Sequence, residues 1–321
     1  MNNNIYHQTI IEFENKRLNK EFMIKQRQED LYSRFPRLKA INFELNTLGL
    51  QLAKTLITDY NSDMLNDFQI FSENLTAEKN EILRSAGYPK NYLEISYDCK
   101  KCNDSGFINS TVCSCFTKAL ISKYYQQSNM IKILAEENFD NFRLDYYDAR
   151  TKNFSVSPNL NIQNILSKTL QFVKEFNDTE DNLYLYGNPG LGKTYLSHCI
   201  AKELLDQGYI VIYQTAADLI DTIRKAKFVS NDPLLECLYE CDLLIIDDLG
   251  TENLTEFANN ELFNLINRRL MDKKNHVIST NLTIKDLETR YSSRLTSRVL
   301  GNFNFLKFIG DDIRLKKAKI L

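Results

Sequence analysis

The sequence predicts an α/β fold, a parallel sheet with helices on both faces, preceded by a helical N-terminal region. From Ile162 onward, short apolar runs alternate with segments of helical period. Before this part, apolar residues recur three and four apart between Leu38 and Leu52, which is the spacing of one helix face. Strands are expected near residues 183–186, 210–214, 242–247, 276–280 and 304–309.

The N-terminal region is expected to hold three helices. The first covers residues around 10–32, and Pro36 separates it from the helix that carries the Leu38–Leu52 stripe. The third is expected to begin at an N-cap on Thr76 and to end near Gly87. The apolar stripe either belongs to a core or presents a surface to a partner, and the sequence leaves both readings open.

A chain of 321 residues has room for two domains of ordinary size. Residues 143–160 carry no sustained apolar period and are expected to form a linker. The predicted organisation is therefore an N-terminal domain at 1–142 and an α/β domain at 161–321.

Composition limits the classes of partner. The net charge of −2 argues against a general binder of polyanions, so any contact with nucleic acid has to be local. There is no long apolar run, and the polar start Met-Asn-Asn-Asn does not resemble a signal peptide. We therefore expect a cytoplasmic protein without membrane contact, in which clustered cysteines indicate a metal rather than disulfides.

Four of the seven cysteines are clustered. Cys99 and Cys102 form one close pair, Cys113 and Cys115 form another, and Gly106 allows a turn after the first pair. Such pairs converge on one Zn²⁺, and four thiolates leave no open position for catalysis, so a structural zinc site is expected. The alternative is four unligated thiols, since the second pair has one intervening residue instead of two.

A glycine-rich segment lies between a predicted strand and a predicted helix. Gly187–Thr194 reads G-N-P-G-L-G-K-T, in which the glycines let the backbone turn and aim its N–H groups at phosphates. Lys193 is expected to reach the β- and γ-phosphates, Thr194 to ligate Mg²⁺, and the helix N-terminus to favour negative charge. The chain is therefore expected to bind a nucleoside triphosphate through Gly187, Asn188, Pro189, Gly190, Leu191, Gly192, Lys193, Thr194 and Tyr195.

Two carboxylates follow the apolar run Leu243–Ile246. Asp247 is placed to hold Mg²⁺, and Asp248 to orient and deprotonate an attacking water. Asn281, at the end of another predicted strand, is a candidate for sensing the γ-phosphate, although asparagine is also a common turn residue.

Arg290, Arg294 and Arg298 are spaced by four and are expected on one face of a helix. They form either a solvated basic face or an arginine finger that reaches the nucleotide of a neighbouring subunit. Self-association through the α/β domain is the corresponding expectation.

Together these motifs resemble the AAA+ ATPases and, within them, the DnaC/DnaI-type helicase loaders. The resemblance covers most of the chain and includes the nucleotide motifs, the cysteine cluster, and the segments 86–89, 138–142 and 293–302. It implies that Arg298, or else Arg294, is the finger, that Asn281 is the first sensor and that Arg314 is the second.

The same resemblance implies a function. Such loaders bind a hexameric replicative helicase through the N-terminal domain and deliver it onto single-stranded DNA, with ATP as the switch. Two features depart from the wider family: Asp248 stands where glutamate is usual, so slow, assembly-dependent hydrolysis is expected, and too few residues follow the last strand for a full lid domain. The short end is similar to the loaders, but it leaves the placement of Arg314 open.

Contact with DNA has a weaker basis. A basic patch with one aromatic residue is formed by Arg224, Lys225, Lys227 and Phe228. The patch either binds DNA or is a solvated helix face or subunit contact.

Three other functions stay open. An IstB-type transposition helper has a similar ATPase domain but acts on duplex DNA, and its simpler N-terminal part argues against it. A small-molecule kinase needs an acceptor pocket and a lid that the sequence does not show. A nucleotide-gated adaptor with negligible turnover is compatible with Asp248.

Overall fold

The computed structural model describes residues 3–58, 62–109, 111–127, 129–151, 154–227 and 233–318. The chain divides into two compact units, which are treated separately. The helical unit comprises Ile10–Gly106, and the sheet unit comprises Met1–Thr9 together with Phe107–Leu321.

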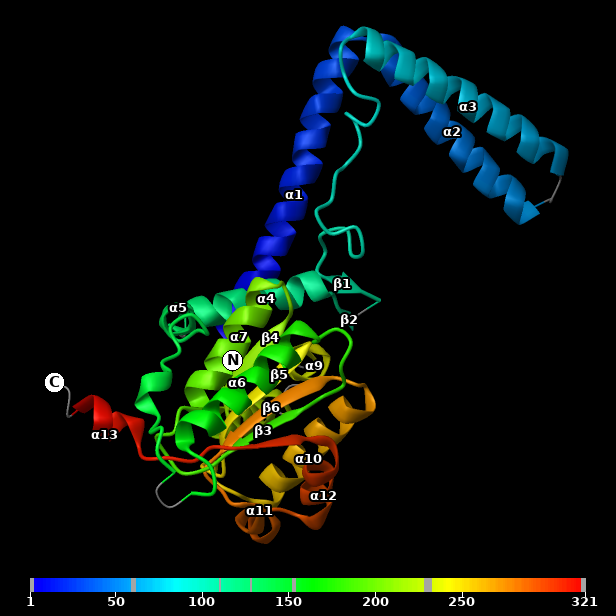
Figure 1. The fold of residues 1–321 in the computed structure, drawn as a ribbon. Coiled ribbons are helices and arrows are strands. Elements are labelled where there is room, and N and C mark those ends of the chain that lie inside the picture. The colour runs from blue at the N-terminus through cyan, green and yellow to red at the C-terminus, as the bar shows by residue number, and fades with distance from the viewer. Residues whose placement is uncertain are drawn as a thin grey trace. The chain divides into compact units, whose positions relative to one another are not determined.

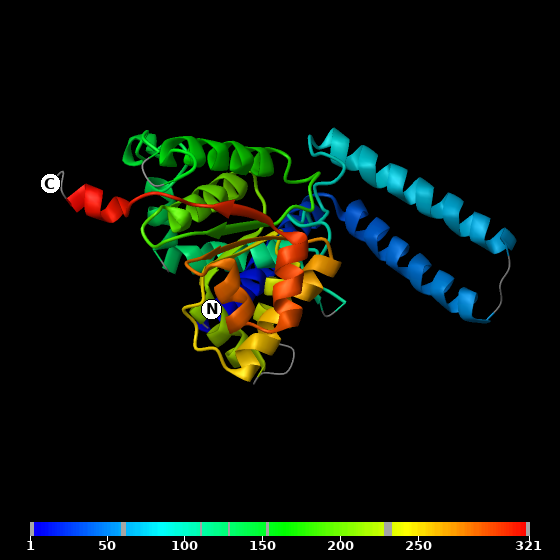
Figure 2. The same cartoon turned by 60° about the horizontal axis from the view of Figure 1, so that its bottom comes forward.

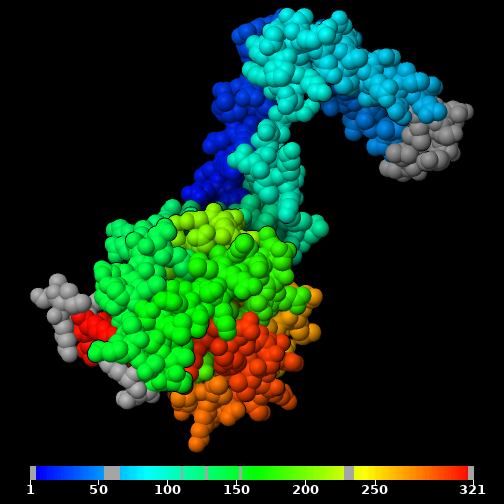
Figure 3. Space-filling model, in the orientation of Figure 1, coloured from blue at the N-terminus to red at the C-terminus, as the bar shows by residue number. Residues whose placement is uncertain are grey.

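The first three helices are α1 (Asn3–Arg34), α2 (Pro36–Thr58) and α3 (Ser62–Ser85). The helical unit contains α2, α3 and the part of α1 from Ile10 onward. Proline at the first position of α2 confirms the predicted break, because a proline there lacks only an N–H that the helix does not use. Helices α2 and α3 form a hairpin, whose surface is drawn in blue and cyan in Figure 3. A buried core is made by Leu31, Leu38, Leu83 and Leu93.

The apolar stripe on α2 is buried in its first part and lines a cavity in its second part. Leu38 and Ile41 are buried, as a core stripe would be. Further along the helix, Leu45, Leu48 and Leu52 line a cavity of 360 Å³ between α2 and α3. The core reading is confirmed for Leu38 and Ile41, whereas a partner surface on the rest of the stripe stays a prediction.

The predicted N-cap at Thr76 is wrong, since α3 begins at Ser62 and Thr76 lies in its interior. Its hydroxyl donates to the carbonyl oxygen of Ser72 at 2.7 Å, which is how a threonine satisfies its side chain inside a helix. The predicted end of the helix is confirmed. Gly87 has a φ of 82°, and the N–H of Tyr88 donates to the carbonyl oxygen of Leu83 at 2.8 Å, which closes the last turn.

The sheet unit contains the predicted parallel sheet, with the spatial order β4-β5-β6-β3-β7. Each neighbouring pair of strands is parallel. All five predicted strands are present, as β3 (Leu183–Tyr186), β4 (Val211–Thr215), β5 (Leu243–Leu249), β6 (Asn275–Thr280) and β7 (Asn304–Lys307). The strands β3, β5 and β6 are almost entirely buried, because helices cover both faces.

Figures 1 and 2 show the helices on the two faces of this sheet, with the green helices of residues 158–206 on one side and the yellow and orange helices of residues 256–302 on the other. The described helices that follow β3 in the chain are α7 (Lys193–Asp206), α8 (Ala216–Lys227), α9 (Pro233–Glu240), α10 (Glu256–Met271), α11 (Ile284–Arg290), α12 (Ser293–Asn302) and α13 (Ile313–Ala318). The elements before it are β1 (Phe107–Ile108), β2 (Thr111–Val112), α4 (Ser114–Gln127), α5 (Met130–Glu136), the 3₁₀ helix η1 (Leu144–Tyr146) and α6 (Pro158–Lys174).

Residues 107–151 pack with the sheet. The Tyr125 hydroxyl on α4 donates to the carbonyl oxygen of Val211 at 2.9 Å. In the segment expected as a linker, Tyr147 is buried and its hydroxyl donates to the carbonyl oxygen of Leu191 at 2.9 Å. The chain passes from one compact unit to the other between residues 9 and 10 and again between residues 106 and 107, whereas the functional domain boundary near residue 142 stays a prediction.

Among the described helices, none is both long and apolar enough to cross a membrane.

Candidate nucleotide site

The site lies where the carboxyl ends of the parallel strands meet. Strand β3 leads into the glycine-rich loop, and it has β6 on one side and β7 on the other. In open parallel sheets, ligands bind in the crevice beyond the carboxyl ends of such strands. The next strand in line, β5, brings Asp247 and Asp248 to the same edge.

The loop needs its glycines for space as well as for conformation. At Gly187, with φ of 142°, a Cβ would lie 2.4 Å from the carbonyl oxygen of Phe308. At Gly190, with φ of 75°, a Cβ would lie 2.0 Å from the carboxylate of Asp312. A side chain at either position would collide with neighbouring protein atoms, so the loop holds this conformation because both residues are glycine.

Lys193 is the first residue of α7 and is 6% exposed. Its ammonium donates to the carbonyl oxygens of Gly187 at 2.7 Å and Asn188 at 2.8 Å, and to Oδ1 of Asn281 at 2.8 Å. Burial lowers the pKa of Lys193 to about 8, against the opposing effect of the two neighbouring aspartates. A triphosphate at this position would favour the charged form and so restore the ordinary protonation.

Asp247 is 4% exposed and accepts hydrogen bonds from hydroxyl groups. Thr194 Oγ1 lies 3.0 and 3.2 Å from its two carboxylate oxygens, and the Tyr213 hydroxyl donates to Oδ2 at 2.7 Å. Ser279 donates to Oδ1. A hydroxyl and a carboxylate side by side are the oxygen donors that Mg²⁺ prefers, so Thr194 and Asp247 fit the magnesium site expected from the sequence.

A bulge in β5 brings two consecutive carboxylates to one edge. Ile246 pairs with Ile278 and Leu249 pairs with Thr280, so Asp247 and Asp248 together stand opposite a single residue of β6. Asp248 has a φ of 58°, a conformation that few residues other than glycine adopt. Without this bulge the two side chains would alternate between opposite faces of the sheet.

The side chain of Asp248 meets the predicted sensor. Asn281 Nδ2 donates to Oδ1 of Asp248 at 2.9 Å, while Oδ1 of the same amide accepts from Lys193. Burial, and then repulsion from Asp247, raise the pKa of Asp248 above its ordinary value. A carboxylate with a raised pKa, beside the end of the glycine-rich loop, is suited to accept a proton from water.

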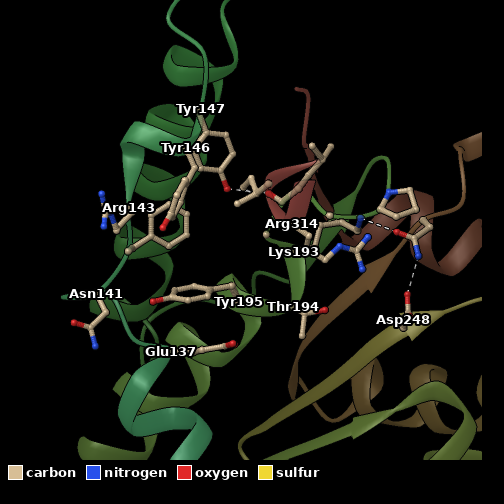
Figure 4. A pocket seen from close by; sticks show the side chains of 17 residues that line it. Glu137, Asn141, Arg143, Tyr146, Tyr147, Lys193, Thr194, Tyr195, Asp248 and Arg314 are labelled. Atoms are coloured by element: carbon tan, nitrogen blue, oxygen red, sulfur yellow. Dashed lines mark hydrogen bonds between the residues drawn. The ribbon is translucent and has the colours of Figure 1, made fainter. Parts of the chain in front are cut away.

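A cavity of 370 Å³ extends from the loop toward residues 137–147. Figure 4 shows Tyr146, Tyr147 and Tyr195 on one side of it and Lys193 and Arg314 on the other. The aromatic rings, together with Lys193 and Arg314 near the loop, match a ligand with a flat ring and a charged tail, which is the form of a nucleotide. Asn141 and Phe142, which belong to the segment 138–142 singled out in the sequence, also line the cavity.

The arginines are placed as follows. Arg314 lines the cavity of its own chain and pairs with Asp312 at 3.1 Å. Arg294 and Arg298 are exposed on α12, four residues apart. The expectation of three arginines on one helix is wrong, because α11 ends at Arg290, whose guanidinium donates to the carbonyl oxygen of Glu252 at 3.1 Å.

The basic patch at the end of α8 is partly neutralised by acids of the same chain. Arg224 pairs with Asp221 at 2.9 Å, and Lys227 pairs with Glu261 at 2.6 Å. Lys225 is exposed. Phe228, the aromatic member of the predicted patch, lies outside the described residues.

The cysteine cluster forms within the segment 99–115. The sulfur atoms of Cys99, Cys102, Cys113 and Cys115 all lie within 4.8 Å of one another. Four sulfurs at this spacing fit one tetrahedral Zn²⁺.

We expect purified protein to contain close to one zinc per chain, because a closed four-thiolate site holds the metal tightly. Elemental analysis after purification under reducing conditions measures this content. Replacement of Cys102 by serine removes one ligand and should lower the zinc content, whereas replacement of Cys199, a buried cysteine of α7, should not. Metal-free protein from a zinc-replete preparation would contradict the assignment.

A family model described as IstB-like ATP binding protein matches residues 121–319, which is more than half of the chain. The chain belongs to this family. The match covers the glycine-rich loop, both aspartates and the cavity. The cavity is therefore the candidate nucleotide site of this ATP-binding domain.

Relatives were also found by sequence and by structure. The replicative helicase loader DnaC of Escherichia coli K12 is 31% identical over 156 residues, which cover 47% of this chain and 63% of that protein. The phage-like element PBSX protein XkdC of Bacillus subtilis 168 is 25% identical over 221 residues, which cover 63% of this chain and 78% of that protein. A crystal structure of the DnaC helicase loader matches 51% of this chain and 99% of its own, at 23% identity and a TM-score of 0.45.

Sequence reasoning missed several residues of the site. Tyr146 and Tyr147 fall in the part expected as a linker, where the absence of an apolar period hid them. Tyr213 and Ser279 lie inside predicted strands, where nothing in the alternating pattern marks them as different from core residues.

Proposed function

We propose that this protein is an ATP-dependent loader that binds the hexameric replicative helicase and places it on single-stranded DNA. The observation that carries the proposal is the 31% identity to the DnaC helicase loader of Escherichia coli. The geometry of the loop, Asp247, Asp248 and Asn281 supports ATP binding and hydrolysis as the switch. The aligned region covers 63% of that relative, so a loader activity and its partners are a proposal for this chain.

Self-association is part of the proposal. Arg298 is exposed on α12 and lies outside the residues that line the cavity of its own chain. In the loader it reaches the ATP of a neighbouring copy, so that hydrolysis depends on assembly. The shorter side chain of Asp248, compared with glutamate, keeps turnover slow.

The helical unit supplies the surface for the helicase. Phe43 and Leu50 are seven residues apart on α2, hence on one face, and are 73% and 68% exposed. On α3, Ile70 and Phe71 are 58% and 49% exposed. Exposed apolar side chains of this size are typical of a protein-binding surface. Single-stranded DNA is a second partner, for which exposed Lys225 is a candidate contact.

Replacement of Arg298 by alanine should leave ATP binding by the monomer unchanged but abolish ATP-dependent assembly, with hydrolysis reduced about 1,000-fold or more as for other arginine fingers. Size-exclusion chromatography with light scattering and a phosphate-release assay measure the two effects. Arg294→Ala is the matched control, four residues away on the same helix. If Arg298→Ala assembles and hydrolyses ATP normally while Arg294→Ala does not, the finger is Arg294.

Native mass spectrometry of the protein with the replicative helicase of its own organism, with and without ATP and Mg²⁺, tests the loader function. A defined complex is expected, and Phe43→Ser should weaken it because a large exposed side chain is lost from the proposed contact. Met271→Ser, which changes an equally exposed side chain of the sheet unit, is the control. The absence of a complex in every nucleotide state would contradict the proposal.

In that case the IstB-type transposition helper becomes the favoured function, since the matching family model is described as IstB-like ATP binding protein. Binding of duplex DNA that depends on ATP, measured by fluorescence anisotropy, would then be the distinguishing result. A nucleotide-gated adaptor would instead bind the helicase but show no phosphate release in the complex.

A further inference from the structure

The carboxylate of Asp247 is held by three hydroxyl groups that come from three different elements. Thr194 belongs to α7, Tyr213 to β4 and Ser279 to β6. Only the first of the three was expected at the site from the sequence. Asp247 and Ser279 are 4% and 1% exposed, so the bond between them is made away from solvent.

The three hydroxyls divide the two carboxylate oxygens between them. Tyr213 donates to Oδ2 at 2.7 Å, and Ser279 donates to Oδ1. Thr194 Oγ1 lies close to both, at 3.0 Å from Oδ2 and 3.2 Å from Oδ1. The strand hydroxyls thus occupy one position on each oxygen, and both oxygens keep a second position directed toward Thr194.

We propose that Tyr213 and Ser279 are positioning residues that fix the carboxylate of Asp247 in the orientation in which it binds Mg²⁺ together with Thr194. The inference rests on the ATP·Mg²⁺ site of the proposed function and adds two residues to it. Hydrogen bonds to a metal-binding carboxylate orient it and tune its affinity, and this is the role of the two hydroxyls.

Tyr213 is itself held rigidly. Tyr213 pairs with Ile245 and Thr215 pairs with Asp247, so the side chains of Tyr213 and Asp247 lie on the same face of the sheet. The backbone N–H of Tyr213 donates to the Tyr125 hydroxyl at 3.1 Å. The ring lies 4.7 Å from the imidazole of His198, measured between centroids. A phenol held at both backbone and ring points its hydroxyl in one direction.

Ser279 connects the two aspartates. Its hydroxyl accepts the backbone N–H of Asp248 at 3.0 Å while it donates to the carboxylate of Asp247. It stands opposite the bulge in β5, where regular strand pairing is interrupted. Alanine at this position would leave a buried N–H without its partner and the carboxylate free to turn.

Neutral donors suit this task. A lysine or arginine paired with Asp247 would cancel part of the negative charge that attracts a divalent cation. Tyrosine and serine hydroxyls orient the carboxylate and leave its charge available.

The test is a titration of the full-length protein with Mg²⁺ in the presence of a fluorescent ATP analogue, for Tyr213→Phe and Ser279→Ala. We expect the Mg²⁺ concentration at half-saturation to rise about 10-fold in each variant, as for the loss of other hydrogen bonds to metal ligands. The affinity for the analogue in EDTA should stay within about twofold of the wild type, since neither hydroxyl lies on the phosphate loop.

Matched controls are Tyr184→Phe, a fully buried tyrosine on β3, and Ser197→Ala, a fully buried serine on α7 whose hydroxyl has no hydrogen-bond partner among the described residues. Ser279→Thr keeps the hydroxyl and should restore the wild-type midpoint. The inference is overturned if the Mg²⁺ midpoints of Tyr213→Phe and Ser279→Ala equal those of the controls, or if affinity in EDTA falls equally. Failure of the loader function appears separately, as the absence of a helicase complex for the wild-type protein.

Discussion

Replacement of Lys193 by alanine is expected to lower the affinity for ATP by at least about 100-fold, because each charge-assisted hydrogen bond to phosphate contributes about 1.5–3 kcal/mol. Lys193 already reaches into the loop, where its ammonium contacts the carbonyl oxygens of Gly187 and Asn188. A triphosphate seated on the loop offers stronger acceptors at the same place. Isothermal titration calorimetry with ATP and Mg²⁺ measures the loss.

Lys202 provides the matched control. It lies on the same helix, pairs with Asp206 and faces away from the cavity residues, so Lys202→Ala should bind ATP like the wild type. Circular dichroism shows whether Lys193→Ala keeps its helical content, which separates loss of the site from loss of the fold. Unchanged ATP affinity in a folded Lys193→Ala protein would disprove the assignment of the phosphate loop.

Features set by local sequence could be predicted. The glycine-rich loop, the strand positions and the acid pair each depend on a few neighbouring residues, and the sheet unit has them where the pattern indicated. The break between Arg290 and Arg294 also had a local signal. Thr283 with Asp286 forms a capping box that starts α11, and Ser292 caps α12. The prediction of a single helix used only the spacing of four between the arginines and did not take these caps into account.

Features set by pairing between strands could not be predicted. Whether Asp247 and Asp248 face the same way depends on the bulge opposite Ser279, and the register of β5 against β6 is a property of the folded sheet. The contact of Tyr213 with Asp247 likewise requires knowing that β4 and β5 are neighbours in register. Tyr213 and Ser279 look like ordinary strand residues in the sequence, because the apolar pattern indicates which residues are buried but not which residue each one contacts.

Asp248→Asn is expected to reduce ATP hydrolysis by about 100-fold or more while ATP binding is kept, since a general base contributes about 10²–10⁴ to the rate. The amide keeps nearly the same shape and still offers an oxygen to Nδ2 of Asn281, so the hydrogen bond at 2.9 Å has a replacement. What is lost is the ability to take a proton from water. A phosphate-release assay in the presence of the assembled complex, with ATP affinity measured in parallel, distinguishes the two effects.

The raised pKa of Asp248 predicts how both the rate of hydrolysis and the stability of the fold change with pH. Hydrolysis by the wild type should rise with pH as Asp248 loses its proton, and the rise should be centred above the ordinary pKa of an aspartate. For folding, a carboxyl whose pKa is higher in the native state binds more protons there than in the unfolded state. Stability therefore falls as pH rises from the unfolded pKa through the folded one.

Asp248→Asn removes this cost of burying a charge, so its melting temperature should exceed that of the wild type at neutral pH, and the difference should vanish below the unfolded pKa. Asp178→Asn, the same substitution at an exposed position, is the control. Loss of hydrolysis together with a gain in stability would show that Asp248 serves function at a cost in folding stability. Its φ of 58° is independent evidence of strain at this residue. A loss of hydrolysis together with a lower melting temperature would instead show that Asp248 supports the fold through its hydrogen bond to Asn281.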